Sequence, residues 1–394
     1  MQHTTHFYIS DFKKGAIEMT KKILAVTFAI FLIALLLLTS FSKKSDFSES
    51  ENRELASLPN FSLASILDKS FMNGFDTYFS DHFFGRSFWV NLKSNIELIS
   101  LKKENNSILL TEKDTLVEDL KKPDERKLAQ NIDGILRFKE KNPDAKIYTA
   151  IAPTACDIYG EYLPYGKKTW NQKEVLNSFY NDISSASFGI DLYSTLSAKK
   201  DQYIYYGTDH HWTSLGAYYA YNQIASSLDF KPYEKSSFDI EHATDSFYGT
   251  FSSKSNISVK PDTIDIYKPA KPESTVTEVV VNNGKTVKTY SDLYFREWLS
   301  KKDKYSVFLG QVQPEITLKT NVQNNKKLLI FKDSFAHSLV PFLALHYSEI
   351  KLIDLRYTNQ HYSEFVNITD YDNVLLLYNI ESITHNNDIA ALGD

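Results

Sequence analysis

Cysteine is almost absent from this chain of 394 residues, which contains only Cys156. A single cysteine forms no intrachain disulfide and cannot supply a zinc ribbon or a C-x-x-C redox pair, so disulfide scaffolds and thiol redox enzymes are excluded. Glycine and proline are also scarce, with 13 and 11 residues, while 42% of the chain is hydrophobic. This composition excludes a disordered or collagen-like chain and predicts a folded protein.

An excess of positive charge is also missing, since the formal net charge is -5. The charge is unevenly distributed: residues 1–44 hold six lysines against Asp11 and Glu18, so this segment carries +4 and the rest of the chain carries -9. Proteins that bind nucleic acid need a basic face that displaces counterions. The acidic body therefore argues against a nucleic-acid partner.

Charged residues are absent from residues 23–41, which read ILAVTFAIFLIALLLLTSF between two lysine pairs. At about 1.5 Å of rise per residue, this run is just long enough to cross the roughly 30 Å hydrocarbon layer of a bilayer. We therefore predict a transmembrane signal anchor at 23–41. Lysines are more numerous before the run than after it, which favours a cytoplasmic N-terminus at 1–22 and an extracytoplasmic body in the cell envelope.

A cleaved signal peptide is the alternative interpretation of the same run. The run is longer than a usual h-region, and its exit at 39–41 lacks a clean small-x-small cleavage site, so the anchor is favoured. Met19 stands just before a lysine pair and is a second candidate start of translation, which would leave the topology unchanged. The polar segment 42–60 is predicted to be a tether to an extracytoplasmic domain at 61–394.

Apolar spacing indicates that this domain is α/β, with a parallel sheet flanked by helices. Helical spacing of three and four residues occurs at 63–67, 71–84, 124–141, 175–183 and 193–199. Short β-rich or apolar runs typical of strands occur at 146–151, 327–331, 350–355 and 373–378. An alternation of strand, loop and helix is typical of parallel sheets.

A block at about 250–320 interrupts the α/β alternation. Residues 276–281 and 285–290 alternate in β-rich side chains around Asn282, Asn283 and Gly284, which predicts a two-stranded hairpin. We interpret this block as an insertion on the α/β domain.

The motif Asp209-His210-His211-Trp212 stands directly before a predicted helix at 214–228. If the motif is extended, Asp209 and His211 project to the same side, so the carboxylate can orient the imidazole as a general base requires. Two other interpretations stay open. The histidines can be packed, hydrogen-bonded loop residues beside a tryptophan, or Asp209, His210 and His211 can ligate a metal.

A second candidate site lies where an apolar strand ends in Lys332-Asp333-Ser334 and continues as a predicted helix at 334–346. A serine at such a turn presents its hydroxyl at the carboxyl edge of the sheet, and the helix start offers backbone N–H donors to an oxyanion. The alternative role of Ser334 is that of an ordinary helix N-cap. Together with Asp209 and His211, Ser334 supplies the three residue types of a Ser-His-Asp triad.

These segments resemble the DHHW family of bacterial exported proteins, over about residues 45–380. The resemblance rests on four blocks, which are Asp209–Trp212, Glu51-Asn52-Arg53, Asp81-His82-Phe83 with Arg86, and the run from Lys332 to Tyr357. That family is similar to the SGNH-hydrolase-like domains of the alginate O-acetylation proteins AlgJ and AlgX, which carry an Asp-x-His motif upstream of the serine. The resemblance implies an SGNH-like fold in which Asp209 orients, His211 is the base and Ser334 is the nucleophile.

Other site residues follow less directly from the resemblance. Lys332 stands where the common SGNH block has glycine, and the Ser334 N–H is the natural first oxyanion donor. Cys156 is expected to be a small packed residue. The candidates for further oxyanion or substrate contacts are Gly249, Gly310, Arg356, Tyr357 and Asn379.

The activity implied by the resemblance is O-acetylation of a cell-surface or secreted polysaccharide through an acetyl-enzyme, with no cofactor and no metal. A membrane-bound O-acyltransferase is the implied partner that brings acetyl across the membrane, because acetyl-CoA is cytoplasmic. Three alternatives remain: a carbohydrate esterase with the same triad, a catalytically silent glycan-binding or assembly protein, and a metal hydrolase that uses residues 209–211. Esterase and transferase differ only in the acceptor, which is water or a sugar hydroxyl.

Overall fold

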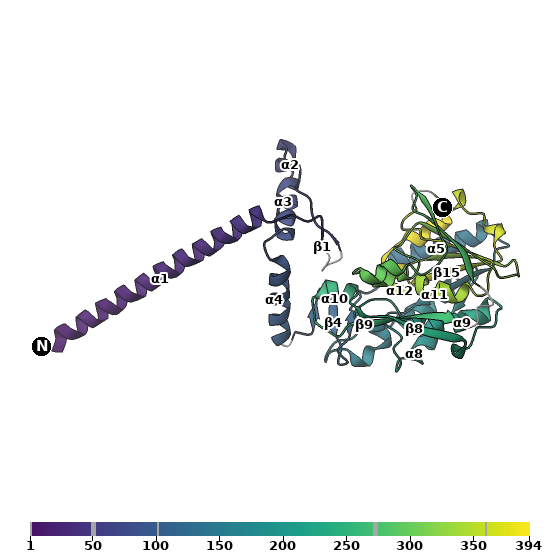
Figure 1. Cartoon of the computed structure of the whole chain (residues 1–394), viewed down its shortest axis with the longest axis horizontal. Coiled ribbons are helices and arrows are strands. Elements are labelled where there is room, and N and C mark those ends of the chain that lie inside the picture. Colours follow the sequence, from purple (N-terminus) through teal and green to yellow (C-terminus); the bar gives the residue numbers. More distant parts are fainter. Residues whose placement is uncertain (1, 49–52, 101, 271–274, 359–360) are drawn as a thin grey trace. The chain divides into compact units, whose positions relative to one another are not determined.

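The structure is a computed structural model that describes residues 2–48, 53–100, 102–270, 275–358 and 361–394 (Figure 1). Contacts divide the chain into two compact units, Met1–Lys93 and Ser94–Asp394. The Glu51-Asn52 part of the family resemblance lies outside the described residues.

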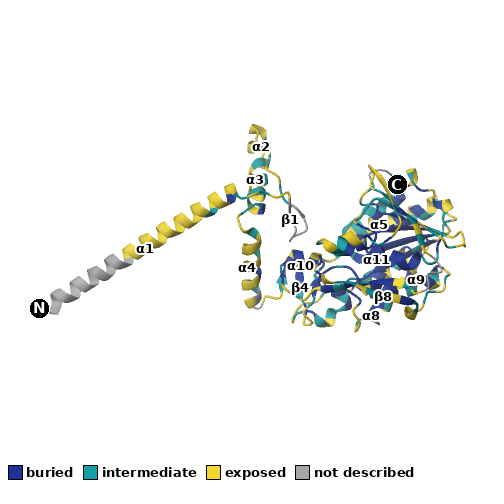
Figure 2. Cartoon of the chain, viewed as in Figure 1, coloured by how far each residue is buried: buried dark blue, intermediate teal, exposed yellow. Residues whose placement is uncertain are grey.

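The first unit begins with one long helix, α1 (Gln2–Phe41). Its segment Glu18–Phe41 is apolar and long enough to cross a membrane, and most of its side chains are exposed (Figure 2). An exposed apolar surface of this length is unfavourable in water and fits a lipid environment or an export signal. The predicted apolar helix is therefore present, and its orientation stays a prediction.

The rest of the first unit consists of a short ribbon and helices. The elements are β1 (Phe47–Ser48) paired with β2 (Arg53–Glu54), α2 (Leu63–Leu67), α3 (Ser70–Asp81) and α4 (Arg86–Ile99), which crosses the boundary of the unit. Phe71 contacts Phe61 and Phe75, with ring centroids 5.2 and 6.0 Å apart. These contacts lie within residues 61–93, which group with the first unit. The boundaries of the domain predicted at 61–394 stay a prediction.

The second unit contains a mixed sheet of eight strands in the order β11-β10-β12-β14-β13-β15-β6-β7. The strands are β6 (Ile147–Ala152), β7 (Phe188–Ile190), β10 (Val276–Asn282), β11 (Val287–Tyr290), β12 (Glu315–Thr320), β13 (Lys327–Lys332), β14 (Glu349–Ile353) and β15 (Asn373–Asn379). The five strands from β14 to β7 run parallel, as predicted, whereas β11, β10 and β12 are antiparallel.

The predicted hairpin at 276–290 is confirmed as β10 and β11, but it does not stand apart as an insertion. It continues the main sheet, because β10 pairs with β12 and β12 pairs with β14. Val279, Ile316 and Leu318 are fully buried in the same core as the parallel strands. Burial of these side chains explains why the block extends the sheet.

Helices cover both faces of the sheet. They are α5 (Glu125–Lys141) and α7 (Gln172–Asp182) on one face, and α8 (Leu192–Ser197), α9 (Ser214–Ser227) and α11 (Ala336–Leu343) on the other. Side chains of a strand alternate between faces. Accordingly, Leu328 and Ile330 join the core under α9 and α11, while Leu329 and Phe331 join the core under α5 and α7.

Smaller elements complete the second unit. They are β3 (Glu104–Asn105), β4 (Ile108–Leu110), β5 (Leu116–Glu118), α6 (Ala155–Ile158), β8 (Phe238–Phe247), α10 (Thr250–Ser255), β9 (Asp262–Pro269) and α12 (Ile380–His385). The first three strands form one small sheet, and β8 pairs with β9 in another. The loop 203–213, which carries the Asp-His-His-Trp motif, leads into α9.

Candidate active site

Ser334 lies in a turn between β13 and α11 that the carboxylate of Asp333 holds in place. One oxygen of Asp333 accepts the N–H of Phe335 at 2.9 Å, and the other accepts the N–H of Asn379 at 2.6 Å and the hydroxyl of Ser382 at 2.9 Å. The turn is thereby tied to its own helix start and to the end of the neighbouring strand β15.

The Ser334 side chain does not cap α11. This helix begins at Ala336, two residues later than the sequence predicted, and its N-cap residue Phe335 makes no capping hydrogen bond with its side chain. The Ser334 hydroxyl instead lies 2.7 Å from Nε2 of His211. The N-cap interpretation therefore does not describe this serine.

Asp209, His211 and Ser334 are in contact in that order. The Nδ1 atom of His211 lies 2.6 Å from Oδ1 of Asp209, on the opposite side of the ring from Ser334. Asp209 and His211 are both buried. A carboxylate on Nδ1 keeps the proton there and leaves Nε2 to accept a proton from the hydroxyl, which is the arrangement of an activated serine.

Hydrogen bonds keep Asp209 ionised. Its Oδ2 accepts the N–H of Thr250 at 2.8 Å and the Thr250 hydroxyl at 2.6 Å, and its Oδ1 accepts the N–H of His211 at 3.1 Å. Burial by itself would raise the pKa of Asp209, but the neighbouring imidazoles of His210 and His211 and these hydrogen bonds lower it below its usual range.

Gly249 makes room for this carboxylate. A Cβ atom on Gly249 would stand 2.3 Å from Cβ of Asp209, so a larger residue cannot occupy the position without a shift. The Gly249 N–H donates to the hydroxyl of Thr208 at 2.9 Å and is not directed to Ser334. Gly249, a candidate oxyanion donor in the sequence analysis, therefore serves the close approach of Asp209 instead.

Buried side chains fix the loop on which the motif lies. Asp262 accepts the N–H groups of Gly207 and Thr208, each at 2.7 Å. The Trp212 indole donates to the carbonyl of Phe335 at 3.1 Å, which ties the loop to the residue after Ser334. Spacing gave no indication of Asp262, because it lies 54 residues after Thr208 in the sequence.

Tyr305 is a second site residue that the sequence analysis missed. Its ring stacks on His211 with centroids 3.7 Å apart and an interplanar angle of 10°. Its hydroxyl donates to the carbonyl of Ser334 at 3.1 Å. One side chain therefore positions both the imidazole and the turn of the serine, and no local motif marks it among the many tyrosines of the chain.

The Ser334 N–H is available to an oxyanion. Among the described residues, no hydrogen bond from this N–H is found. The other two backbone candidates are occupied, since the Gly310 N–H donates to Ser306 at 3.0 Å and the Asn379 N–H donates to Asp333. A backbone donor beside the nucleophile is the usual first member of an oxyanion hole.

Lys332 and the candidate Arg356 meet at a buried carboxylate behind the turn. The ammonium of Lys332, which is fully buried, lies 3.1 Å from Oδ2 of Asp354 and 2.9 Å from Nε2 of His337. Arg356 donates to the two oxygens of Asp354 at 2.8 and 2.7 Å. Burial lowers the pKa of Lys332, and Tyr357 is an exposed residue beside this group.

The ligand atoms of Asp209, His210 and His211 lie within 4.8 Å of one another, so these residues satisfy the simplest geometric condition for a metal site. Their atoms already have other partners, however. Both nitrogens of His211 face Asp209 and Ser334, and Nδ1 of His210 lies 2.8 Å from the Thr250 hydroxyl. Burial lowers the pKa of His210. The arrangement of Asp209, His211 and Ser334 is that of a hydrogen-bonded relay.

Two other sequence candidates are structural. Asp81 accepts the N–H of Ala56 at 2.9 Å, and Nε2 of His82 lies 2.9 Å from the carbonyl of the same residue, so this block fixes a turn within the first unit. Cys156 is buried, as expected, and burial raises the pKa of its thiol to about 12. Such a thiol is not a nucleophile at neutral pH.

Comparison with known proteins gives the family and the fold of the chain. The family model described as "DHHW protein" matches residues 51–111 and 127–353. The probable alginate O-acetylase AlgJ of Pseudomonas syringae pv. tomato is 25% identical over 222 residues, which are 53% of this chain and 54% of AlgJ. The chain thus matches about half the length of this curated relative.

Two solved structures share the fold. A DHHW family protein from Eubacterium siraeum superimposes with a TM-score of 0.59 at 25% identity, over 73% of this chain and 95% of that protein. PatB1 of Bacillus cereus superimposes with a TM-score of 0.62 at 22% identity, over 71% of this chain and 98% of PatB1.

Proposed function

Because this chain belongs to the DHHW family, and because a relative that it matches over about half of each protein is named a probable alginate O-acetylase, we propose that it is an O-acetyltransferase that acts on a polysaccharide. The observation that carries the proposal is the 2.7 Å contact between the Ser334 hydroxyl and Nε2 of His211, with Asp209 on the other ring nitrogen. The five parallel strands would then form an SGNH-like core, with Ser334 at its carboxyl edge.

The first half-reaction forms an acetyl-enzyme. The Ser334 oxygen attacks the carbonyl carbon of an acetyl donor while its proton passes to Nε2 of His211. The tetrahedral oxyanion is stabilised by the Ser334 N–H. When the carbonyl re-forms, the bond to the leaving group breaks, and the leaving group takes the proton from His211.

The second half-reaction transfers the acetyl group to the sugar. A sugar hydroxyl gives its proton to Nε2 of His211 and attacks the acetyl carbon, and the Ser334 oxygen leaves and recovers the proton. Asp209 stays ionised throughout and stabilises the imidazolium.

The N-terminal helix sets the cellular context of the proposal. With residues 1–22 in the cytoplasm and 23–41 across the membrane, the second unit would lie outside the membrane, where acetyl-CoA is absent. The acetyl group would then come from a membrane-bound O-acyltransferase partner.

The test is to supply the full chain, in detergent micelles, with p-nitrophenyl acetate and an oligosaccharide acceptor, and to measure acetylated sugar and free acetate separately. We expect acetylated sugar to form faster than free acetate. Ser334→Ala should abolish both products, while the exposed serine variant Ser226→Ala should retain both. Free acetate alone would establish the esterase instead, and equal product from Ser334→Ala would refute both enzymes.

A further inference from the structure

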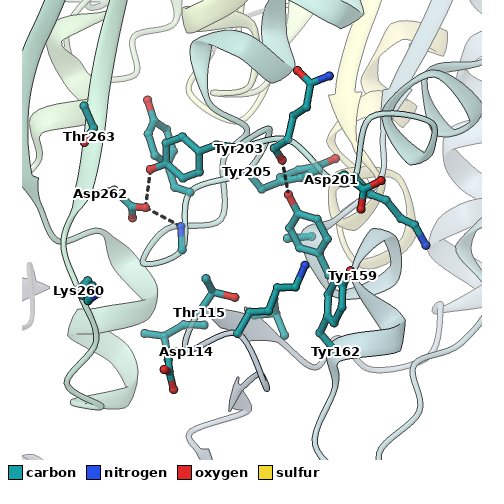
Figure 3. Close-up of a pocket in the computed structure, with 18 of the residues that line it drawn as sticks. Asp114, Thr115, Tyr159, Tyr162, Asp201, Tyr203, Tyr205, Lys260, Asp262 and Thr263 are labelled. Atoms are coloured by element: carbon teal, nitrogen blue, oxygen red, sulfur yellow. Dashed lines mark hydrogen bonds between the residues drawn. The ribbon is translucent and has the colours of Figure 1, made fainter.

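A pocket with a volume of about 530 Å³ opens in the second unit, next to the loop that carries the Asp-His-His-Trp motif (Figure 3). This volume falls within the range of about 300–1,000 Å³ that is usual for small-molecule sites. Its walls come from the start of β5, from α6 and the turn after it, and from the segments 200–207 and 260–263. The triad residues do not line it.

Tyrosine dominates the lining of the pocket, with five side chains: Tyr159, Tyr162, Tyr203, Tyr205 and Tyr206. Tyr203 is 43% exposed, and the rings of Tyr159 and Tyr162 are partly exposed on another wall (Figure 3). Tyrosine combines an apolar ring face with a polar hydroxyl, so a wall of tyrosines suits a ligand with both apolar faces and hydroxyl groups.

The charged side chains of the pocket balance one another. Three lysines and three aspartates line it, namely Lys113, Lys200, Lys260, Asp114, Asp201 and Asp262. One ammonium, that of Lys113, lies 3.7 Å from the centroid of the Tyr162 ring. A pocket without net charge gives no general attraction to a polyanion, since such attraction requires an excess of positive groups.

We propose that this pocket binds a segment of a neutral oligosaccharide, which is the acceptor of the acetyltransferase proposed above. A pyranose ring presents C–H groups on its faces and hydroxyl groups on its rim, and these match the tyrosine faces and the charged and hydroxyl groups of the pocket. This inference rests on the proposed function for its biological meaning, but it makes a binding claim of its own.

The pocket shares structural parts with the catalytic loop. Asp262 accepts the hydroxyl of Tyr203 at 2.6 Å and the N–H of Gly207 at 2.7 Å, and these three residues line the pocket. Asp209 follows Gly207 by two positions. A chain of four residues spans at most about 13 Å. Gly207 and His211 are therefore close enough for one extended glycan to occupy the pocket and reach towards Ser334.

The test measures binding to the full chain in detergent micelles by isothermal titration calorimetry. The probes are neutral hexasaccharides of glucose, N-acetylglucosamine and mannose, and an anionic hexamannuronate. We expect at least one neutral probe to bind and to bind more tightly than the anionic one. Failure of all three neutral probes, or tighter binding of hexamannuronate, would overturn the proposal.

Tyr162 offers a matched set of variants. Tyr162→Ala should weaken binding of the neutral probe about tenfold, while Tyr162→Phe, which keeps the ring, should bind nearly as the natural chain does. Tyr165→Ala is the control, because Tyr165 is fully exposed and lies outside the pocket lining. Equal affinity of Tyr162→Ala and the natural chain would show that the sugar binds elsewhere.

Ester hydrolysis separates this inference from the proposed function. Tyr165→Ala, outside the pocket, should hydrolyse p-nitrophenyl acetate at the natural rate. In the transfer assay Tyr162→Ala should raise KM for the oligosaccharide with kcat unchanged. Sugar binding without any ester cleavage would refute the enzyme and leave the pocket assignment standing. Ester cleavage without sugar binding would refute the pocket assignment alone.

Discussion

The two sides of Ser334 are built differently. On one side, Asp209, His211 and Thr250 form a chain of short hydrogen bonds that ends at the serine hydroxyl. We call this the relay side. On the other side, Lys332 and Asp354 form a fully buried ion pair at the end of β13, which we call the ionic side. The relay side provides a path for a proton, whereas the ionic side has no contact with the hydroxyl and holds the strand end in place.

This difference predicts that substitutions on the two sides will have separable effects. Loss of a relay group should remove chemistry and leave a folded protein, because the loop is also held by Asp262 and Trp212. Loss of an ionic group should reduce stability, because it removes one partner from the buried charges of Lys332, Asp354 and Arg356. The predictions below test that separation.

The largest effect is expected on the relay side. His211→Ala should lower the rate of p-nitrophenyl acetate cleavage by about 10²- to 10⁴-fold, because general-base assistance is worth that much. Stopped-flow absorbance measures the rate, and circular dichroism checks the fold. The control is His242→Ala, since His242 is an exposed residue that pairs with Asp265. A natural rate in His211→Ala would remove the relay from the mechanism.

The ionic side should show its effect in the free energy of unfolding. Lys332→Met removes the buried ammonium and leaves Asp354 paired with Arg356 alone, so it should lower stability by less than the ~3–5 kcal/mol of an unpaired buried charge. Urea denaturation followed by fluorescence gives this value for the full chain in micelles. Lys326→Met, at an exposed lysine, serves as the control. Equal stability of the two variants would contradict a structural role for Lys332.

Parts of this comparison could be predicted from the sequence. The strands at 327–331 and 373–378 and the turn at Ser334 have strong local signals, since each apolar run ends in polar residues. The contact of Asp209 with His211 was expected for an extended segment. The motif instead forms a bend, in which Oδ1 of Asp209 also accepts the N–H of His211. Such patterns depend on neighbouring residues only, so they can be recognised without knowledge of the tertiary contacts.

The remaining parts depend on tertiary contacts. Thr250, Asp262 and Tyr305 reach the site from distant segments, and nothing in their own neighbourhoods distinguishes them. The antiparallel edge formed by β10 to β12 is also tertiary, because a hairpin signal does not say which strand the hairpin will join. The structural role of Lys332 could not be predicted from the sequence, because it depends on the ion pair with Asp354, which compensates its charge.

A smaller effect is expected from Thr250, which supports the relay without taking part in proton transfer. Thr250→Val removes the hydroxyl that donates to Asp209 at 2.6 Å and keeps the N–H. A hydrogen bond to a charged group contributes about 1.5–3 kcal/mol, so kcat should fall by about 10- to 150-fold. Thr277→Val, at an exposed threonine, is the control for the substitution. An unchanged kcat would show that the N–H alone orients the carboxylate.

The smallest effect concerns pH and lies away from both sides. Burial lowers the pKa of His346 to about 4. The unfolded chain binds this proton near pH 6.5, and the folded chain does so only near the lower value, so stability falls as the pH decreases through that window. Tm measured from pH 7 to pH 4 should therefore decrease, and His346→Gln should make the slope shallower. A slope that the substitution leaves unchanged would contradict this assignment.

The central claim is that Ser334 becomes acetylated with His211 as the base. The most direct measurement is to mix the full chain with p-nitrophenyl acetate, quench the reaction with acid after a short time, and locate the acetyl group by peptide mass spectrometry. The account predicts acetyl on the peptide that contains Ser334, with slower labelling in His211→Ala and none at that position in Ser334→Ala. The central claim would be contradicted if acetyl were found only on other residues and to the same extent in the natural chain and in Ser334→Ala.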